Sequence, residues 1–256
     1  RGMVFDPQGR QLWKKRAGMP AYDKSAPDRA EIDPAVYKKI TIWLCRVLKE
    51  ERPDIFRHIG GISIACMRDC LTVVDREGNA LRPLILWLDQ RRTEVVRPKN
   101  KLLLAGASLI GAGTLLREAG QVGYTNYLLD YEKETWERAD KFVFLSGYLH
   151  RWLLGFFMDS TANQPGHVPF DSSRQKWSDW RDIKYHVFPV EREKLVPLAP
   201  PGTVMGTICP QAAEETGLSG EVKIIAGASD KACETLGVGC VDDREAVLSF
   251  GSQATV

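Results

Sequence analysis

Short apolar runs that end in turn residues alternate with a stretch of helical spacing in the first third of the chain. Residues 3–12 read as an apolar strand, an Asp-x-x-Gly turn and a second strand, and residues 72–81 repeat this order, so two β-hairpins are expected. A further strand at 62–67 would extend the second hairpin to three antiparallel strands. Residues 33–48 combine an Asp-Pro start with apolar side chains at helical spacing, which predicts a helix.

The middle of the chain has helical composition and then a less regular stretch. A helix is expected over 124–139 with a break near Tyr131, and a second helix runs from Ser146 to Gly155, where the glycine ends it. Residues 171–201 are rich in tryptophan, charge and proline, which indicates an irregular surface with short helices.

Two strand-to-turn units close the pattern. The apolar run 222–226 predicts a buried strand that leads through Gly-Ala-Ser into a short helix at 231–236. A final strand is expected at 246–250 and is followed by Gly-Ser. Because hairpins occur together with strand-to-helix units, we expect an α/β architecture.

Composition places the chain among ordinary globular proteins: of 256 residues, 44% are hydrophobic and 27% charged, and the net charge is +2. A disordered chain would hold fewer apolar residues or more net charge. The near-neutral balance gives no electrostatic footprint for DNA or RNA, and no run approaches the ~18 apolar residues of a membrane span. The six cysteines are too sparse for a disulfide scaffold, so thiols in a reducing cytoplasm are expected, with neither nucleic acid nor membrane as partner.

Charged residues follow several of the expected strands. Arg68 and Asp69 stand between two strand-like runs, where an adjacent guanidinium and carboxylate can grip vicinal hydroxyls; a surface salt bridge across a hairpin is the alternative. Asp89 ends the apolar run 85–88, where an aspartate either caps a helix or faces a cleft. These positions are candidates for substrate binding.

Asp230 follows the small residues 227–229, which let a ligand approach the backbone closely. A helix start favours the ionised carboxylate, which suits a general base acting on a hydroxyl; an N-cap is the alternative. Gly251 and Ser252 follow the last expected strand and are candidates for a turn that cradles phosphate.

Taken in order, these segments resemble the FGGY carbohydrate kinases of the actin-like, RNase H-like superfamily. Residues 78–91 are similar to the family's "GNxLRPaIlWnDqR", residues 201–206 to "PsGtvvG", and residues 227–230 to "GGGD". Residues 248–252 resemble the second phosphate loop, "lSlGTS". Arg1 looks like the end of the first phosphate motif, Asp-x-Gly-Thr-x-x-x-Arg.

The resemblance implies an α/β domain of the actin-like, RNase H-like type, a mixed sheet flanked by helices. It assigns 1–241 to the substrate domain, without its first strand, and 242–256 to the beginning of the nucleotide domain. The implied function is a sugar or polyol kinase that uses ATP and Mg²⁺, with Asp230 as catalytic base. The residues implied to contact the substrate or phosphate groups are Arg68, Asp69, Asp89 and Asp230 for the substrate, and Arg1, Gly251 and Ser252 for phosphate.

Departures from the family pattern bear on the substrate. Asp69 stands where glycerol kinases have glutamate, and Tyr124 does not align with the aromatic residue that they use against their substrate. Met67-Arg68 replaces the Met-His pair of xylulokinases, so neither substrate is favoured. Without the upstream phosphate loop and the second domain, the chain is expected to be inactive alone.

Two other functions stay open beside the kinase. One is a non-catalytic sugar-binding or regulatory module on the same scaffold, favoured by Ala228, Ser229 and Ser252 at positions where the family has Gly, Gly and Thr. The other, a weaker alternative, is an actin-like ATPase, which would not need the Arg68-Asp69 pair. A homodimer is a candidate arrangement for any of these functions.

Overall fold

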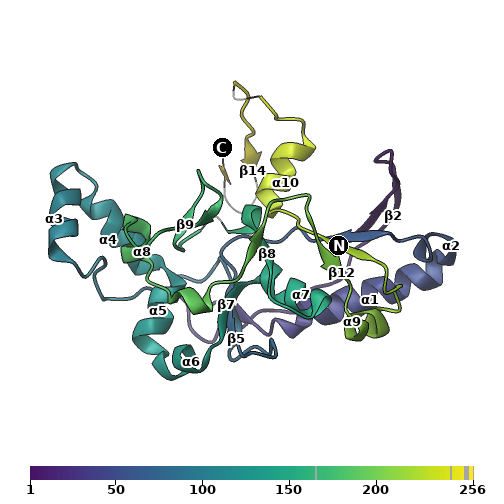
Figure 1. Cartoon of the computed structure of the whole chain (residues 1–256), viewed down its shortest axis with the longest axis horizontal. Helices are drawn as coiled ribbons and strands as arrows, with labels where there is room; N and C mark the ends of the chain where they lie inside the picture. The colour runs from purple at the N-terminus through teal and green to yellow at the C-terminus, as the bar shows by residue number, and fades with distance from the viewer. Residues whose placement is uncertain (165, 243, 251–253, 256) are drawn as a thin grey trace.

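The molecule is built from small sheets in the middle with helices extending to both ends, as the computed structural model in Figure 1 shows. Helices α3 (Lys101–Leu109) and α4 (Gly113–Val122) lie at one end, and α1 (Ala35–Glu51) extends to the other. Helix α10 (Asp230–Gly237) projects beside β14 (Ser249–Phe250). The structure describes residues 1–164, 166–242, 244–250 and 254–255.

A four-stranded antiparallel sheet forms part of the core. Its order is β3 (Glu31–Ile32), β6 (Leu84–Ile85), β5 (Leu71–Val74) and β7 (Lys141–Phe144). All four residues of β5 are buried, and the apolar side chains of the sheet pack against the helices that follow it. Burial on both faces explains why β5 reads as an uninterrupted apolar run.

A second, three-stranded sheet has the order β12 (Val204–Thr207), β13 (Lys223–Ile225) and β4 (Gly61–Ser63). Strand β4 is shorter than the strand expected at 62–67 and pairs in parallel with β13, so the expectation of three antiparallel strands with the second hairpin is wrong. This parallel pairing places Ile62 opposite Ile224, in an apolar cluster that also holds Leu153. Strands β4 and β13, which are far apart in the sequence, are thereby joined in one sheet.

Both predicted hairpin turns are confirmed. In each turn, an aspartate side chain accepts a hydrogen bond from the backbone N–H four residues later. Strand β1 (Gly2–Phe5) pairs with β2 (Gln11–Lys15), and the Asp6 Oδ1 atom between them accepts from the Arg10 N–H at 2.9 Å. In the second turn, Asp75 Oδ1 accepts from the Asn79 N–H at 2.8 Å. The glycines of the two turns have positive φ, +80° and +89°, which an L side chain rarely adopts.

The helices expected at 33–48, 124–139 and 146–155 follow the sequence pattern. Helix α1 begins after Pro34, with the Asp33 Oδ1 atom accepting from the Ala35 N–H at 2.9 Å. Helix α7 (Leu145–Leu154) ends at Gly155, whose φ is +81°. The expected helix over 124–139 is divided near the predicted break, into α5 (Tyr124–Tyr131) and α6 (Lys133–Arg138).

Short elements complete the chain. Residues 171–201 are irregular with short helices, as expected, but they are not only surface, because Val187 and Val190 are buried. No helix among the described residues is long and apolar enough to cross a membrane. All six cysteines are free. The remaining elements are α2 (Pro53–Phe56), β8 (Asp159–Ser160), η1 (Thr161–Asn163), β9 (Phe170–Asp171), β10 (Lys176–Trp177), α8 (Ile183–Val187), η2 (Arg192–Lys194), β11 (Leu198–Ala199), α9 (Pro210–Thr216), β14 (Ser249–Phe250) and β15 (Ala254–Thr255).

Candidate active site

Backbone hydrogen bonds bring the ends of three chain-distant strands together at the start of α10. The Asp230 N–H donates to the Cys66 carbonyl at 2.8 Å, and Cys66 and Ser229 form an isolated parallel bridge. The Ser229 N–H donates to the Ala162 carbonyl at 3.2 Å. The first turn of α10 is therefore fixed between the segment that leads to Arg68 and the turn that follows β8.

A buried aspartate holds the turn after β8. Asp159 accepts from the Ser146 hydroxyl and from the Gln164 side-chain amide, both at 2.8 Å, and lies 3.0 Å from His150 Nδ1. All four side chains are buried. Because a buried polar group is costly unless it is hydrogen-bonded, this cluster fixes the turn that carries the Ala162 carbonyl.

Asp230 is the first residue of α10, but it is not the residue that caps the helix. Ser229 is the N-cap: its hydroxyl accepts from the Ala232 N–H at 3.3 Å, and the residue is buried. Asp230 is exposed, and its Oδ1 atom accepts from the Lys231 N–H at 2.8 Å. Since Ser229 fills the capping role, the Asp230 carboxylate remains accessible at the positive end of the helix.

The small residues before Asp230 serve the packing of the backbone. A Cβ on Gly227 would lie 2.2 Å from the Ile64 carbonyl oxygen, so only glycine fits there. From the sequence, these small residues are expected to let a ligand approach the backbone. The close approach at Gly227 is instead that of the chain segment that follows β4.

Asp69 lies in a clamp formed by a loop that is distant in sequence. The His167 N–H donates to Asp69 Oδ1 at 3.2 Å, and His167 Nδ1 lies 3.2 Å from Asp69 Oδ2. Asp69 has a φ of +52°, and a Cβ on Gly166 would lie 2.2 Å from Asp69 Oδ1. Arg68 is exposed and forms no hydrogen bond or ion pair with the described residues. The salt bridge across a hairpin, considered as an alternative for this pair, is therefore not found there.

Asp69 and Asp230 both raise the pKa of one buried thiol, that of Cys70. Burial raises the pKa of Cys70 to about 12, and the negative charges of Asp69 and Asp230 add to this rise. Burial also raises the pKa of Cys66, and Asp230 again contributes. The charges of Asp69 and Asp230 thus both oppose ionisation of the Cys70 thiol.

Asp89 is buried rather than exposed at a cleft, which corrects the position expected for a substrate ligand. Its side chain is 0% exposed. One carboxylate oxygen accepts from the Ala30 N–H at 2.9 Å and from Arg91 Nη2 at 2.8 Å, and the other accepts from Arg91 Nε at 2.9 Å. Nor does Asp89 cap a helix, because the next helix begins at Lys101. Ala30 is distant from Asp89 along the chain, and Arg91 follows it by two residues. Together these two partners occupy both carboxylate oxygens of Asp89.

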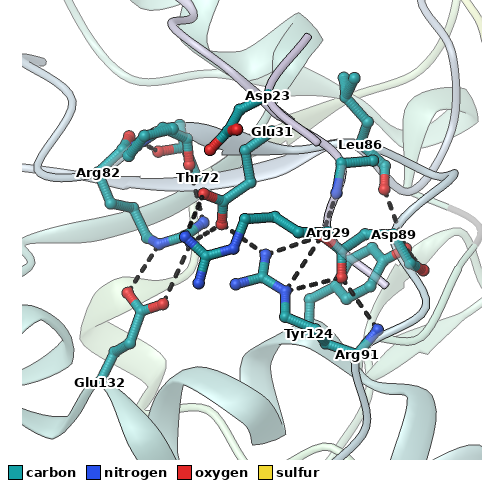
Figure 2. Close-up of polar contacts among 12 residues, drawn as sticks. Asp23, Arg29, Glu31, Thr72, Arg82, Leu86, Asp89, Arg91, Tyr124 and Glu132 are labelled. Carbon is teal, nitrogen blue, oxygen red and sulfur yellow. Dashed lines mark hydrogen bonds and ion pairs between the residues drawn. The ribbon is translucent and has the colours of Figure 1, made fainter. Parts of the chain in front are cut away.

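Asp89 belongs to a buried network of ion pairs, shown in Figure 2. Glu31 accepts from both Arg82 and Arg91, and its side chain is 5% exposed. Arg82 also contacts Glu132, with Nε 2.8 Å from Oε2. The network joins β3 to the chain on both sides of β6 and to the α5–α6 junction, so it braces the four-stranded sheet.

Tyr124 is hydrogen-bonded to the backbone beside this network. Its hydroxyl lies 3.1 Å from the carbonyl oxygens of Leu86 and Asp89. Burial raises the pKa of Tyr124, and the charges of Asp69 and Asp89 add to the rise. No motif in the sequence indicates a role for Tyr124 or for His167.

The predicted phosphate ligands are only partly within the described residues. Gly251 and Ser252 lie outside them. Arg1 is exposed ahead of β1 and forms no hydrogen bond or ion pair with the described residues. Strand β14 lies against α10, because Lys231 Nζ lies 2.7 Å from both Ser249 Oγ and Glu234 Oε2. The chain segment just before the predicted phosphate turn therefore contacts the helix that begins with Asp230.

Two further features help to delimit the site. Within the described ranges, no group of three His, Cys, Asp or Glu side chains is arranged to hold a metal ion. A surface cavity of about 550 Å³ lies between α5, α8 and residues 97–100, and is lined by Arg97 and Trp180 among others. This cavity shares no lining residue with the candidate site.

Comparison with known proteins gives the family. Residues 1–237 match the FGGY family of carbohydrate kinases, N-terminal domain. A xylulose kinase of Lactococcus lactis is 27% identical over 213 residues, which cover 82% of this chain and 41% of that protein.

Two solved structures are similar in fold. A gluconate kinase from Lactobacillus acidophilus has a TM-score of 0.71 at 21% identity, covering 92% of this chain and 46% of the other. Plasmodium falciparum glycerol kinase with ADP has a TM-score of 0.73 at 16% identity, covering 98% and 50%.

The fold is thus the actin-like, RNase H-like fold of sugar kinases, as the resemblance implied. The chain belongs to the FGGY family of carbohydrate kinases. It spans about half the length of the relatives it matches.

Proposed function

We propose that the chain carries the substrate site of an ATP-dependent sugar or polyol kinase, with Asp230 as the catalytic base. The observation that carries this proposal is the hydrogen bond from the Asp230 N–H to the Cys66 carbonyl, 2.8 Å long. It ties an exposed carboxylate to the segment that continues directly into Arg68 and Asp69. Membership of a kinase family supports the same reaction.

In the proposed reaction, an Asp230 oxygen accepts the proton of a substrate hydroxyl. The oxygen of that hydroxyl forms a bond to the γ-phosphorus of ATP as the bond to the bridging oxygen of ADP breaks, so the products are a sugar phosphate and ADP. Because phosphoryl transfer passes through a loose transition state, the protein acts mainly by positioning and by stabilising charge. Because Ser229 caps the helix, the exposed Asp230 carboxylate is accessible for this role.

Arg68 and Asp69 are proposed to orient the substrate. Arg68 is exposed and offers a fork of N–H donors, whereas Asp69 offers acceptors, so the pair is suited to vicinal hydroxyls. Asp89 contributes indirectly: its carboxylate is consumed by internal contacts, and we assign it to bracing the sheet beside Tyr124.

The proposal for the nucleotide side of the site rests on membership of the family. ATP is the proposed phosphoryl donor, and Mg²⁺ is proposed to enter bound to its phosphates. Arg1, Gly251 and Ser252 are the proposed phosphate contacts, with 1–241 as the substrate domain and 242–256 as the beginning of the nucleotide domain. The protein is proposed to act in the cytoplasm, alone or as a homodimer. Since the chain spans about half of its relatives, we propose that it has no kinase activity by itself.

A sugar panel tests the proposal. The full-length gene product, assayed for ADP release with xylulose, gluconate, glycerol and related ketoses, polyols and sugar acids, should turn over at least one of them. Asp230→Asn should lower kcat by at least about a hundredfold, in the range of a lost general base, while sugar binding persists. Unchanged kcat in this variant would overturn the role of Asp230. Normal turnover by the 256-residue chain alone would contradict the proposed need for the second domain.

The alternative, a sugar-binding or regulatory module without catalysis, rested on the residues that replace the family's glycines. The structure explains one of them physically, because the Ser229 hydroxyl caps α10. Sugar binding by the wild-type protein without ADP release from any member of the panel would favour the module over the kinase.

A further inference from the structure

We infer that His167 is a positioning residue of the substrate site, which holds the Asp69 carboxylate in the orientation that accepts a substrate hydroxyl. This inference rests on the proposed function, because it assigns Asp69 to the substrate. It adds a residue that no motif in the sequence indicates.

The geometry is a two-point clamp. The backbone N–H of His167 holds one carboxylate oxygen of Asp69 at 3.2 Å, and the ring Nδ1 holds the other at 3.2 Å. With both oxygens held, the carboxylate cannot rotate about its terminal bond without losing a contact. A carboxylate has about four acceptor sites, so the clamp leaves acceptor capacity on each oxygen for a substrate.

The loop that carries His167 is shaped for this contact. A Cβ on Gly166 would lie 2.2 Å from Asp69 Oδ1, so a glycine at this position is what allows the carboxylate to reach the His167 N–H. Asp69 itself has a φ of +52°, a conformation that L residues rarely adopt and that persists where surrounding contacts enforce it. Both partners thus carry backbone features that serve the same contact.

The imidazole ring of His167 also packs against Phe188. The ring centroids lie 6.0 Å apart with an interplanar angle of 67°, an edge-to-face arrangement. Phe188 is buried, whereas the His167 side chain is 41% exposed and that of Asp69 is 25% exposed. The pair therefore packs against a buried ring while both of its polar side chains keep exposed surface, which contact with a substrate requires.

The electrostatics agree with the geometry. The hydrogen bond to Asp69 raises the pKa of His167, with burial acting in the opposite direction. A protonated imidazole makes the hydrogen bond charge-assisted, which is stronger than the bond of a neutral pair.

Steady-state kinetics on the full-length gene product test the inference. His167→Phe keeps an aromatic ring beside Phe188 and removes the ring donor; we expect the KM for the sugar to rise about tenfold, the loss of one charge-assisted hydrogen bond. The kcat and the KM for ATP should change less than about threefold, since Asp69 does not take part in proton transfer. His167→Asn keeps a side-chain N–H donor near the position of Nδ1 and should recover most of the sugar affinity.

The control is His58→Phe, which changes an exposed histidine whose side chain makes no hydrogen bond with the described residues. It should leave all three constants unchanged. A sugar KM within twofold of wild type in His167→Phe, or a His167→Asn variant as weak as His167→Phe, would overturn the inference while the kinase stands.

A measurement on the chain itself tests the contact between His167 and Asp69 independently of kinase activity. In an NMR titration of the 256-residue chain, the His167 pKa should lie above the ordinary value of 6.5 and should fall in Asp69→Asn. A His167 pKa that does not respond to Asp69→Asn would overturn the clamp, even in an active kinase. An intact clamp in a full-length protein that phosphorylates no sugar would overturn the proposed function, and with it the role of His167 toward a substrate.

Discussion

The buried ion-pair network should be a strong contributor to stability, and Glu31 is its most informative position. Its carboxylate accepts from Arg82 and from Arg91, and its side chain is 5% exposed. Glu31→Gln keeps the shape and removes the charge, which leaves two buried guanidinium groups with one acidic partner fewer each. Breaking a buried ion pair by removing one partner costs about 3–5 kcal/mol.

The remaining contacts place the expected cost at the lower end of this range. Arg82 keeps Glu132, with Nε 2.8 Å from Oε2, and Arg91 keeps Asp89, with Nη2 2.8 Å from Oδ2. We therefore expect Glu31→Gln to lower the free energy of unfolding by about 3 kcal/mol. For a domain of this size, that loss corresponds to a fall in Tm of about 6–12 °C.

Urea unfolding followed by tryptophan fluorescence measures this loss, with an unchanged m-value as the sign that only stability has altered. Glu137→Gln is the matched control, because its pair with Lys133 joins side chains that are 62% and 77% exposed. Such surface pairs contribute about 0–1 kcal/mol. If Glu31→Gln unfolds at the same urea concentration as Glu137→Gln, the argument for the network is refuted.

Three further predictions concern the candidate site. Gly227→Ala should destabilise the chain and weaken sugar binding, because its Cβ would lie 2.2 Å from the Ile64 carbonyl oxygen; wild-type urea and binding curves would contradict this. Cys233 is exposed, whereas burial raises the pKa of Cys66, so a thiol reagent at pH 7 should modify Cys233 first in the native chain; mass spectrometry of the labelled peptides decides the order. Because the pKa of His167 is raised on folding, its ion pair should contribute stability below pH 6.5 that is lost as the pH rises through the folded pKa. Equal pH dependence of unfolding in His167→Phe and wild type would refute that last claim.

The local parts of the fold were predictable from the sequence because their causes are local. The two Asp-x-x-Gly turns form through hydrogen bonds within a few residues, such as that from the Asn79 N–H to Asp75, and the end of α7 follows from a single glycine, Gly155. The partner of β4 was not predictable in this way. An apolar run indicates a strand, but it does not indicate that the neighbour will be β13, at the far end of the chain.

The same distinction applies to the candidate site. Asp230 could be selected because its motif and its helix start are adjacent in sequence. Asp89 was misplaced because its contacts with Ala30, and the network beyond it, depend on the tertiary fold. His167 was missed because its contact with Asp69 spans 98 positions. The one local sign is Gly166, the residue before His167. A glycine in the sequence does not show which other residue packs against it.

The central claim is that Asp230 and the Arg68–Asp69 pair act on one bound sugar. The most direct measurement is a crystal structure of the full-length gene product with the sugar that it phosphorylates best, or binds best. The account predicts one sugar hydroxyl within about 2.6–3.2 Å of an Asp230 carboxylate oxygen, with neighbouring hydroxyls on Arg68 and Asp69. A sugar held elsewhere, for example in the cavity lined by Arg97 and Trp180, with Asp230 facing only solvent, would contradict it.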